Sequence, residues 1–393
     1  MKLVIAGGGT GGHLMPGLAL AEELLGREGG HQVLYLGAHG GLEQRLVPRF
    51  GYRLALLPSL KGGLLGLDFA QKSVRLCRGY LQARRALLSF EADAVVGLGG
   101  YASVLPALAG WGVEVPVMIL EQNVIPGRAT RKLAPFAKEI GVQFSEAGPF
   151  LKAPKKVKHV GNPLRRRVVE ASYRSAERNL REGPAPEEAT LLVLGGSQGA
   201  QFLNDLVIKA WPKLSKALPG LKVILVAGSE DEPRASAAFA SAGVRGHVLP
   251  FCEHMEELYA EADCVLARSG ATSLAEIAAF ALPSLLVPYP HAADNHQFHN
   301  ARVFASAGAA WLLDQRTLEI ERFVQRVVDT LRQPERRRRM AQAAYKLARP
   351  EAAAETVDRL LRMTDTHLAP PDDPRFDVTP RAPRPPAVHA GVA

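Results

Sequence analysis

Short runs of consecutive apolar residues alternate along most of the chain with longer stretches in which apolar and polar residues recur at helical spacing. In the first part of the chain, the apolar runs predict buried parallel strands at residues 3–6, 32–36, 94–98 and 115–120. Between these strands the spacing predicts helices over residues 14–26, 70–89 and 101–111.

A second series with the same alternation begins at Thr190. Its apolar runs predict strands at residues 190–196, 222–228, 247–251, 263–267 and 284–288. Helices are predicted near residues 199–217, 254–260, 271–280 and 317–332. Repeated units of strand, loop and helix are typical of doubly wound α/β sheets with parallel strands. We therefore expect two such domains.

The boundary between the two series falls near residues 161–167. We divide the chain into an N-terminal domain of residues 1–163, a C-terminal domain of residues 164–365 and a tail of residues 366–393, with a final helix able to pack back on the first domain. A chain of 393 residues exceeds the usual size of one hydrophobic core. The tail is rich in proline and poor in large apolar residues, which predicts disorder.

Both domains open with a strand, a glycine-rich loop and a helix. The first loop is GGGTGG at residues 7–12, and the second is GGSQGA at residues 195–200. The free N–H groups of a helix N-terminus attract anions, so each loop is a candidate cradle for phosphate or diphosphate. The alternative is that glycine only allows each strand to turn tightly into its helix. The repetition of the loop favours a functional role.

The first loop also matches the GxGxxG pattern of dinucleotide-binding proteins, with Gly7, Gly9 and Gly12 at the pattern positions. That class of protein needs an acidic residue for the ribose about 20 residues further on, at the end of the second strand. No Asp or Glu occurs from Gly29 to Leu42. A nicotinamide dinucleotide is therefore disfavoured as the ligand.

Cysteine usage and hydropathy indicate a cytoplasmic protein. The three cysteines are widely spaced and form no CxxC pair, so they give neither a disulfide framework nor a zinc site and fit a reducing compartment. The N-terminus lacks the pattern of a signal peptide, and no window of about eighteen residues is apolar and uncharged. We expect a protein that is soluble or peripheral to a membrane.

The net charge of +9 lies in the first part of the chain, where residues 1–165 hold 20 Lys and Arg against 11 Asp and Glu. Within residues 61–90, six basic residues alternate mainly with leucines, and Asp68 is the one acid. A basic apolar helix suits an anionic membrane surface. The alternative is a core helix with a solvated basic face. Nucleic acid is disfavoured as a partner, because leucines replace stacking aromatics and no nucleic-acid-binding module is recognisable.

Residues 267–300 contain the densest group of candidate site residues. The sequence SGATS at residues 269–273 leads into a helix whose backbone amides can face a diphosphate. Glu276 follows in the first turns of that helix, too far in to be a good capping residue, and its carboxylate can accept hydrogen bonds from both ribose hydroxyls. In the next loop, DNHQ at residues 294–297 can bind sugar hydroxyls, although any surface loop can have this composition.

Six motifs follow one another along the chain: GGGTGGH at residues 7–13, EQN at 121–123, GNPLR at 161–165, GGSQGA at 195–200, RSGATSLAE at 268–276 and DNHQFHNA at 294–301. Together, and in this order, they resemble the MurG family of peptidoglycan-synthesising transferases. The resemblance covers the chain up to about residue 365. It implies the GT-B fold, in which two Rossmann-like doubly wound parallel-sheet domains face a central cleft that holds the active site.

Members of this family transfer N-acetylglucosamine (GlcNAc) from UDP-GlcNAc to the muramyl sugar of undecaprenyl-diphosphate-linked lipid I, which gives lipid II. The resemblance therefore implies a hexosyltransferase with UDP-GlcNAc as co-substrate and lipid I as acceptor. It implies that the N-terminal domain binds the acceptor and the membrane, and that the C-terminal domain binds UDP-GlcNAc. It implies neither a cofactor nor a metal, and the chain contains no Asp-x-Asp pair.

The resemblance also implies roles for individual residues. In the C-terminal domain, the ring of Phe251 and the backbone of Cys252 are implied to hold uracil. Glu276 is implied to hold the ribose, and Gln297 the GlcNAc hydroxyls. The implied diphosphate contacts are Ser197, Ala271 and Thr272, with Arg268 as a further candidate for the leaving group. The implied contacts from the N-terminal side of the cleft are Thr10, Gly11, Gly12, Asn123 and Arg165.

The implied reaction needs a general base, because the acceptor C4 hydroxyl must attack the anomeric carbon opposite UDP and invert it to a β1,4 link. His13 is the favoured base, since the ordinary pKa of histidine, about 6.5, is near neutrality. The alternative is that His13 only caps or lines the glycine loop. Glu121 and Asn123 are the fallback pair. Helix N-termini and backbone amides are expected to stabilise the leaving diphosphate in place of a metal.

A polyprenyl-linked acceptor stays in the membrane, so residues 64–90, with Trp111, become the predicted docking surface for an anionic bilayer. The protein is then expected to be peripheral, on the cytoplasmic face of the cell membrane, with other cell-wall enzymes as further candidate partners. Two alternatives stay open. One is another glycolipid transferase of the same fold, such as a diacylglycerol glycosyltransferase. The other is a UDP-GlcNAc epimerase or a non-hydrolytic sugar-nucleotide-binding protein. The basic apolar helix disfavours the epimerase.

Overall fold

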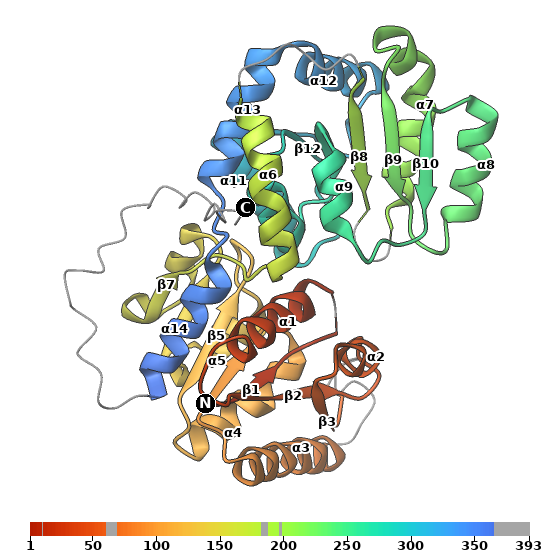
Figure 1. Ribbon diagram of the computed structural model, residues 1–393. Helices are drawn as coiled ribbons and strands as arrows, with labels where there is room; N and C mark the ends of the chain where they lie inside the picture. Colours follow the sequence, from red (N-terminus) through yellow and green to blue (C-terminus); the bar gives the residue numbers. More distant parts are fainter. Residues whose placement is uncertain (10, 60–68, 182–187, 196–198, 365–393) are drawn as a thin grey trace, which may run out of the picture.

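The structure is a computed structural model of the chain, and it describes residues 1–9, 11–59, 69–181, 188–195 and 199–364, with side chains for all of these except 69–72. Two parallel sheets form the centres of two lobes, one above the other in Figure 1. The predicted fold class of two doubly wound parallel sheets is confirmed. The predicted disordered tail and the beginning of the predicted docking segment, residues 64–68, lie outside the described residues.

The N-terminal sheet has seven parallel strands in the order β3-β2-β1-β4-β5-β6-β7. The strands are β1 (Lys2–Ala6), β2 (Gln32–Ala38), β3 (Arg53–Leu57), β4 (Ala94–Gly97), β5 (Val117–Glu121), β6 (Glu139–Val142) and β7 (Val157–His159). Strand β1 pairs with β2 on one side and with β4 on the other, so the order of the strands reverses between β1 and β4. In sheets of this kind, ligands bind outside the carboxyl ends of the strands at such a reversal.

Helices cover both faces of the N-terminal sheet. One face carries α3 (Phe69–Phe90), α4 (Val104–Gly112) and α5 (Arg128–Leu133), and the other carries α1 (Gly11–Leu25) and α14 (Ala352–Thr364). A short helix, α2 (Glu43–Leu46), follows β2. Val4 and Ala6 of β1 pack into one core, and Leu3 and Ile5 pack into the other. Because β1 is buried on both faces, it is a continuous apolar run.

The C-terminal sheet has six parallel strands in the order β10-β9-β8-β11-β12-β13. They are β8 (Thr190–Leu194), β9 (Lys222–Val226), β10 (Gly246–Leu249), β11 (Cys264–Ala267), β12 (Ser284–Leu286) and β13 (Ala310–Leu312). One face is covered by α7 (Gln201–Ala217), α8 (Glu232–Ala242) and α12 (Ile320–Arg332). The other face packs against α6 (Arg166–Leu180), α9 (Met255–Glu261), α10 (Ala271–Ala279), α11 (His296–Ser306) and α13 (Pro334–Lys346).

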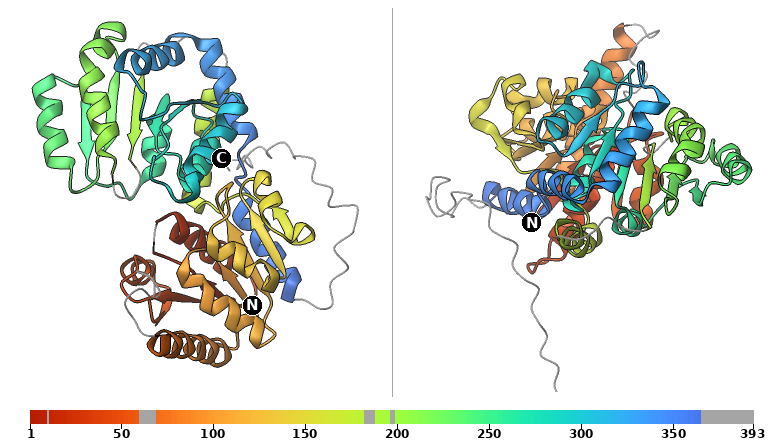
Figure 2. Two further views of the ribbon diagram at one scale, coloured as in Figure 1. Left: turned by 180° about the vertical axis from the view of Figure 1, so that it is seen from behind. Right: turned by 90° about the horizontal axis from the view of Figure 1, so that it is seen from above.

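The chain passes between the lobes twice. Residues 160–165 lead from β7 to α6, and residues 347–351 lead from α13 back to α14, which packs against α1 of the N-terminal lobe. Figure 2 shows α14 beside the N-terminal sheet in the view from behind. The ammonium group of Lys138 donates to the Met363 carbonyl at 3.0 Å, and Arg359 pairs with Glu139 at 3.4 Å. The last helix therefore completes the first domain.

Several short elements were not among the sequence predictions, and these include β3, β6, β7 and β13. Strands β3, β7 and β13 are edge strands, and β3 has only one buried residue, Leu57. Strands β7 and β13 have three residues each, so their patterns are weak in the sequence, whereas β3 contains the apolar run at residues 54–57 that the strand predictions missed. Helix α1 begins at Gly11 rather than at the predicted residue 14. Among the helices of the described residues, none has both the length and the apolar character needed to cross a bilayer.

Candidate active site

The glycine loop after β1 surrounds a buried carboxylate. Glu43 of α2 is completely buried and accepts hydrogen bonds from the backbone N–H of Gly9 at 2.7 Å and of Ala38 at 2.8 Å. A Cβ added at Gly8 would lie 2.2 Å from the carboxyl carbon, and one added at Gly41 would lie 2.3 Å from a carboxylate oxygen. Glycine is therefore required at these positions to make room for Glu43.

Sequence reasoning missed Glu43, although a signal was present. Glu43 is the first acid after the segment Gly29–Leu42, whose lack of acidic residues disfavoured a dinucleotide. Its carboxylate accepts from two backbone N–H groups in the interior of the domain, where no ribose can reach it. Gly8, which lies between two glycines of the GxGxxG pattern, is therefore explained by packing around a side chain of the protein itself.

His13 lies in the first turn of α1, against the turn that follows β4. Its Nδ1 is 3.3 Å from Oε1 of Gln122, a buried side chain at the carboxyl end of β5. A Cβ added at Gly99 would lie 3.2 Å from Cε1 of the imidazole, so the absence of a side chain at residue 99 leaves room for the ring. When Nδ1 carries the proton, it donates to Gln122, and Nε2 keeps its lone pair. Gln122 lies in the EQN motif but was not predicted as a site residue.

The carbonyl of Gly12 lacks the usual helical donor four residues further along the chain. Residue 16 of α1 is proline, which lacks the N–H that would donate to the carbonyl four residues earlier. The hydroxyl of Thr272, in the first turn of α10, donates to this carbonyl at 3.2 Å. The structure thus brings the predicted acceptor loop of the first domain against the predicted diphosphate-binding helix of the second.

Two buried amides support the same end of α10 from the first domain and the linker. Gln143, after β6, donates from Nε2 to the carbonyl of Ala271 at 2.9 Å. Asn162, in the linker, donates from Nδ2 to the hydroxyl oxygen of Thr272 at 3.3 Å. The backbone N–H of Leu274 donates to the carbonyl of Gly270 in the first hydrogen bond of the helix. The backbone N–H groups of Ala271 and Thr272, which precede it, are therefore available to a ligand.

Glu121 is a buried structural acceptor in this structure. Its carboxylate accepts from the backbone N–H of Asn123 at 3.0 Å and from the backbone N–H of Gly127, the N-cap residue of α5, at 2.9 Å. The side-chain oxygen of Asn123 in turn accepts from Nδ2 of Asn300 on α11 at 3.0 Å. Asn123 therefore reaches the second domain, while Glu121 holds the loop that carries it.

Arg268 places a buried positive charge directly before α10. Its side chain is 8% exposed, and Nη1 donates to the carbonyls of Val287 at 2.9 Å and Pro288 at 3.2 Å. The rings of Phe202 and Tyr289 lie within cation–π distance of the guanidinium, at 5.9 and 5.6 Å. Burial lowers the pKa of Arg268 from its ordinary value. Among the described residues, its hydrogen-bond partners are carbonyls rather than carboxylates, which leaves the charge available to an anion.

Glu276, the predicted ribose contact, is half-buried on α10. The hydroxyl of Tyr259 on α9 donates to its Oε2 at 2.9 Å. Burial raises the pKa of Glu276 to about 7; the Tyr259 hydrogen bond opposes this shift, and the negative charge of Glu256 adds to it. The carboxylate is therefore only partly ionised near neutral pH and keeps Oε1 for a ligand.

The predicted uracil contacts lie in residues 250–254, which join β10 to α9 and are called the base loop below. The ring of Phe251 is 56% exposed, and Cys252 is half-buried. The predicted sugar contact, Gln297, lies at the start of α11, and its Oε1 accepts from the backbone N–H of Tyr289 at 2.9 Å. Its side-chain amide NH₂ group has no protein acceptor among the described contacts and is available to a sugar hydroxyl.

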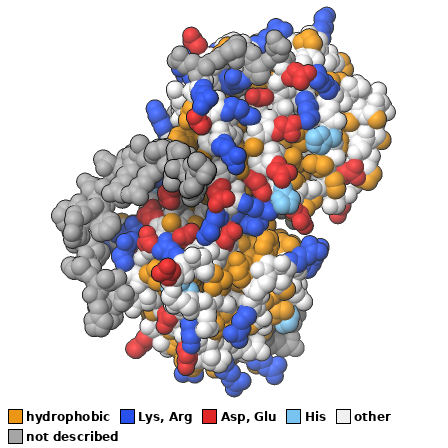
Figure 3. Space-filling view, in the orientation of Figure 1, with side chains coloured by type: hydrophobic (Ala, Val, Ile, Leu, Met, Phe, Trp, Pro, Cys, Tyr) orange, Lys and Arg blue, Asp and Glu red, His pale blue; other side chains and the backbone are white. Residues whose placement is uncertain are grey.

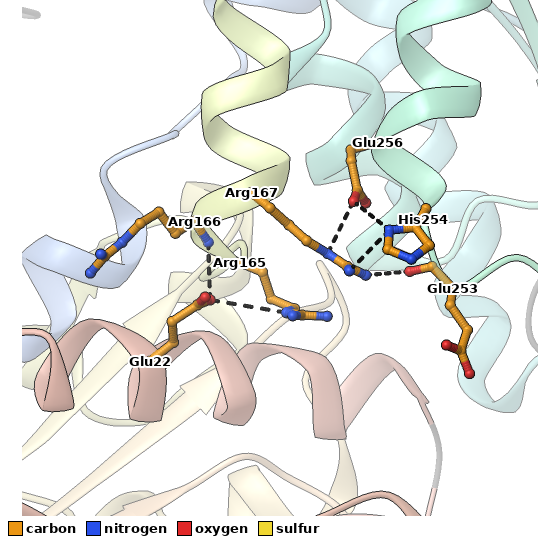
Figure 4. Close-up of polar contacts among 7 residues, drawn as sticks. All are labelled: Glu22, Arg165, Arg166, Arg167, Glu253, His254 and Glu256. Atoms are coloured by element: carbon orange, nitrogen blue, oxygen red, sulfur yellow. Dashed lines mark hydrogen bonds and ion pairs between the residues drawn. The ribbon is translucent and has the colours of Figure 1, made fainter. Parts of the chain in front are cut away.

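Arg165 belongs to a cluster of charged residues at the junction of the two domains. Its Nε lies 4.0 Å from Glu22 on α1, and its guanidinium lies over the ring of Phe50 at 4.8 Å. The neighbouring Arg167 pairs with Glu256, the first-turn acid of α9, at 3.1 Å. Figure 4 shows the contacts of Arg165 with Glu22 and of Arg167 with Glu256, and Figure 3 shows charged side chains gathered where the two lobes meet.

The remaining predicted residues are placed as follows. Gly11 begins α1 beside Gly12, whereas Thr10 and Ser197 lie outside the described residues. No group of three or more His, Cys, Asp or Glu side chains suited to hold a metal ion occurs in the part of the chain that the structure describes.

The fold and the junction of the two lobes together define a class of protein. Two parallel sheets direct their carboxyl ends toward this junction, where the N-terminus of α10 from one domain contacts the turn of α1 that carries His13 in the other. A buried arginine, Arg268, lies just before α10. This arrangement is typical of transferases that use a nucleoside diphosphate sugar, because the donor has an anionic leaving group and the acceptor has a proton to lose.

Comparison with known proteins gives the family. Residues 3–142 match the model of the glycosyltransferase family 28 N-terminal domain, and residues 190–357 match that of the glycosyltransferase family 28 C-terminal domain. The chain belongs to glycosyltransferase family 28, and within it to the MurG enzymes that its motifs resemble.

Two similar proteins carry the same name, UDP-N-acetylglucosamine-N-acetylmuramyl-(pentapeptide) pyrophosphoryl-undecaprenol N-acetylglucosamine transferase. The one from Pelobacter propionicus is 39% identical over 383 residues, which cover 93% of this chain and 100% of that protein. The one from Anaeromyxobacter dehalogenans is 41% identical over 361 residues, which cover 91% of this chain and 92% of that protein.

Solved structures agree with the GT-B fold. The crystal structure of MurG from Acinetobacter baumannii has a TM-score of 0.73 at 28% identity and covers 92% of this chain and 99% of that chain. A UDP-GlcNAc 2-epimerase from Neisseria meningitidis bound to UDP-GlcNAc has a TM-score of 0.63 at 14% identity and covers 92% and 100% of the two chains. At that identity the likeness to the epimerase shows the fold alone.

Glu43 generates a prediction about stability. In Glu43→Gln, the side-chain NH₂ group would face a backbone N–H that needs an acceptor, so we expect the free energy of unfolding to fall by about 1.5–3 kcal/mol. Urea denaturation measures this change. Glu23→Gln is the matched control, because Glu23 forms a partly exposed pair with Arg27 on α1 and should cost less than about 0.5 kcal/mol. Equal losses in the two variants would contradict the role of Glu43.

Proposed function

We propose that this protein transfers GlcNAc from UDP-GlcNAc to the C4 hydroxyl of the muramyl sugar of lipid I, with inversion at the anomeric carbon, and so produces lipid II for peptidoglycan synthesis. The names of its relatives support both substrates. The proposed site of action is the cytoplasmic face of the cell membrane, to which the protein binds peripherally.

One observation carries the proposal. The contact between Thr272 and Gly12 brings the free amides of α10 next to the turn of α1 that holds His13. A donor diphosphate on α10 would therefore place its sugar between the two domains, within reach of a base from the opposite lobe. Neither domain alone supplies both groups.

In the proposed donor site, UDP runs along the carboxyl edge of the C-terminal sheet. Phe251 and the Cys252 backbone hold uracil, and Glu276 accepts from the ribose hydroxyls. The diphosphate lies on the amides of Ala271 and Thr272, with Ser197 as a further contact. Gln297 donates its amide to the GlcNAc hydroxyls. From the other lobe, Thr10, Gly11, Gly12, Asn123 and Arg165 complete the cleft.

His13 is the proposed general base. The acceptor C4 oxygen forms a bond to the anomeric carbon, its proton passes to Nε2 of His13, and the bond between the anomeric carbon and the phosphate oxygen breaks, with the electron pair leaving on UDP. The contact with Gln122 supports this role, because a proton held on Nδ1 leaves Nε2 as the acceptor. Glu121 suits the base role less, since its carboxylate already accepts from backbone N–H groups.

Arg268 and α10 are proposed to stabilise the charge that develops on the leaving diphosphate. A desolvated guanidinium without a carboxylate partner among the described residues attracts an anion more strongly than an exposed one. The amides at the N-terminus of α10 add fixed donors that need no reorganisation. We therefore propose that the reaction requires neither a metal ion nor a cofactor.

Helix α3 is the proposed membrane-docking face, as part of the segment 64–90. Its exposed apolar side chains Val74, Leu81 and Leu88 recur every seven residues and so lie along one stripe of the helix. Arg78 and Arg85 follow Val74 and Leu81 by four residues and border the same stripe. Trp111 of α4, which packs beside α3, is 57% exposed. Apolar burial and charge attraction act together on such a face.

A transfer assay tests the function. With radiolabelled UDP-GlcNAc and a lipid I analogue, we expect label in the lipid product, at the same rate with or without EDTA. In His13→Ala the rate should fall by about 10²-fold to 10⁴-fold while UDP affinity is kept. His247→Ala, at an exposed position on β10, is the control and should leave the rate unchanged. Label on diacylglycerol, or an epimerised free sugar without lipid product, would overturn the proposed function.

The raised pKa of Glu276, about 7, generates a prediction about donor binding. Only the ionised carboxylate accepts from both ribose hydroxyls, so UDP affinity should be constant above pH 8 and fall as the pH drops through 7, by about tenfold at pH 6. Titration calorimetry in buffers of different ionisation enthalpy measures the affinity and the protons released. In Glu276→Gln the pH dependence should disappear.

Glu276 also affects the stability of the fold, and its contribution changes with pH in the opposite direction to the UDP affinity. A carboxyl whose pKa is raised by folding stabilises the folded state below its unfolded pKa of about 4.5, and that contribution is lost as the pH rises through 7. Glu276→Gln should therefore gain stability relative to the wild type between pH 5 and pH 8.

A UDP affinity that does not change between pH 6 and pH 8 would contradict the assignment of Glu276 to the ribose.

The docking face generates a prediction about vesicle binding. Neutralising two basic residues at a membrane surface costs about 2 kcal/mol, so Arg78→Gln with Arg85→Gln should weaken binding to vesicles containing phosphatidylglycerol by about thirtyfold. Arg174→Gln, on the exposed face of α6, is the control. Sedimentation with the vesicles measures the binding, which should also weaken as salt is added. Equal binding to neutral and anionic vesicles would refute the docking face.

A further inference from the structure

Arg167 contacts the base loop from outside it at two residues. It donates from Nη2 to the carbonyl of Glu253, and its Nη1 lies 3.3 Å from Nδ1 of His254. Its Nε lies 3.1 Å from Oε1 of Glu256, in the first turn of α9. Arg49 also reaches the loop, but only through an exposed pair with the Glu253 carboxylate at 4.0 Å. Figure 4 shows the Arg167 guanidinium directed at Glu253, His254 and Glu256. The contacts lie next to Phe251 and Cys252, which are the proposed uracil contacts.

Arg167 itself lies at the point where the chain enters the second domain. It follows Arg165 and Arg166, and both of these contact Glu22 of α1 in the first domain. Glu22 accepts from the backbone N–H of Arg166 at 3.1 Å. Three consecutive residues thus connect α1, the helix that begins beside His13, with the loop proposed to recognise the nucleobase.

The Arg167–Glu256 pair is mostly shielded from water. The side chain of Glu256 is 11% exposed and that of Arg167 is 33% exposed. Removing one partner of such a pair leaves the other charge desolvated and unpaired, so the surrounding chain must move to hydrate it. Oε1 of Glu256 also lies 3.3 Å from Nδ1 of His254, so this carboxylate contacts the mostly exposed base loop directly.

We infer that Arg167 is a positioning residue for nucleobase recognition, a role that rests on the proposed function of the C-terminal domain. It fixes the carbonyl of Glu253 and thereby the path of the base loop. Its contribution falls on the affinity for uridine nucleotides and leaves the bond-breaking step unchanged. Because Arg167 lies close to the linker, the affinity for uridine nucleotides also depends on the position of the linker between the two domains.

Arg178 provides a matched control on the same helix. It donates from Nη1 and Nη2 to the carbonyls of Ala260 and Ala262, both at 2.7 Å, at the far end of α9. Both arginines fasten α6 to the segment that contains α9, but only Arg167 contacts the base loop. A general loss of α6–α9 packing would therefore appear in both variants, whereas loss of loop position would appear only at residue 167.

The test compares UDP with inorganic pyrophosphate, which has no base. In Arg167→Ala, the dissociation constant of UDP and the KM for UDP-GlcNAc should rise by about tenfold, as expected for a lost charge-assisted bond. The kcat and the inhibition by pyrophosphate should stay within about twofold of the wild type. Arg167→Lys, which keeps the charge but replaces the planar guanidinium by a single ammonium group, should restore part of the UDP affinity and remains informative if Arg167→Ala folds poorly.

Each outcome separates the positioning role from its alternatives. Arg178→Ala should lose stability to heat but bind UDP as the wild type does. Equal weakening of UDP and pyrophosphate in Arg167→Ala, or a UDP loss in Arg178→Ala as large as in Arg167→Ala, would overturn the positioning role. If the wild-type protein itself bound no UDP, the proposed function would fail instead.

Discussion

The hydrogen bond between the Thr272 hydroxyl and the Gly12 carbonyl joins the two halves of the cleft at the place where chemistry is proposed to occur. Pro16 has no N–H to offer the carbonyl of Gly12, which leaves this acceptor available to a donor outside α1. A missing donor in one domain is thus compensated by a contact with the other. Gln143 and Asn162 reinforce the same junction from buried positions, so α10 is held against the glycine loop by several weak bonds.

The glycine loop itself is shaped from inside the protein. Its backbone passes around the carboxylate of Glu43, and Gly8 is needed because any side chain there would overlap that group. The N–H groups of Gly7 and Gly9 are taken by the carbonyl of Leu36 and by the carboxylate of Glu43, so the start of the loop is held by the protein itself. The GxGxxG pattern alone does not reveal this constraint, because Gly8 stands at one of its unspecified positions.

The domains are coupled by more than the cleft. The chain returns through residues 347–351 so that α14 completes the first domain, and the linker at residues 160–165 leads into an arginine that holds the base loop. A relative motion of the lobes must therefore bend both crossings and disturb contacts between them, such as those of Glu22 with Arg166 and of Thr272 with Gly12. The parts that bind the donor and the parts that bind the acceptor are mechanically connected on both sides of the cleft.

The sequence by itself determined the two parallel sheets, since strands buried on both faces must be continuous apolar runs, and it determined the family through motifs that keep their order along the chain. Only the tertiary structure decided which groups those motifs contact. Edge strands such as β7, which has three residues with a lysine at its centre, are too short to be recognised locally. The roles of Glu43, Glu121 and Arg167 depend on partners, burial and backbone geometry that lie far away along the chain or form only on folding. Spacing along the chain does not encode the desolvation that turns one carboxylate into a structural acceptor and leaves another, Glu276, half-ionised near pH 7.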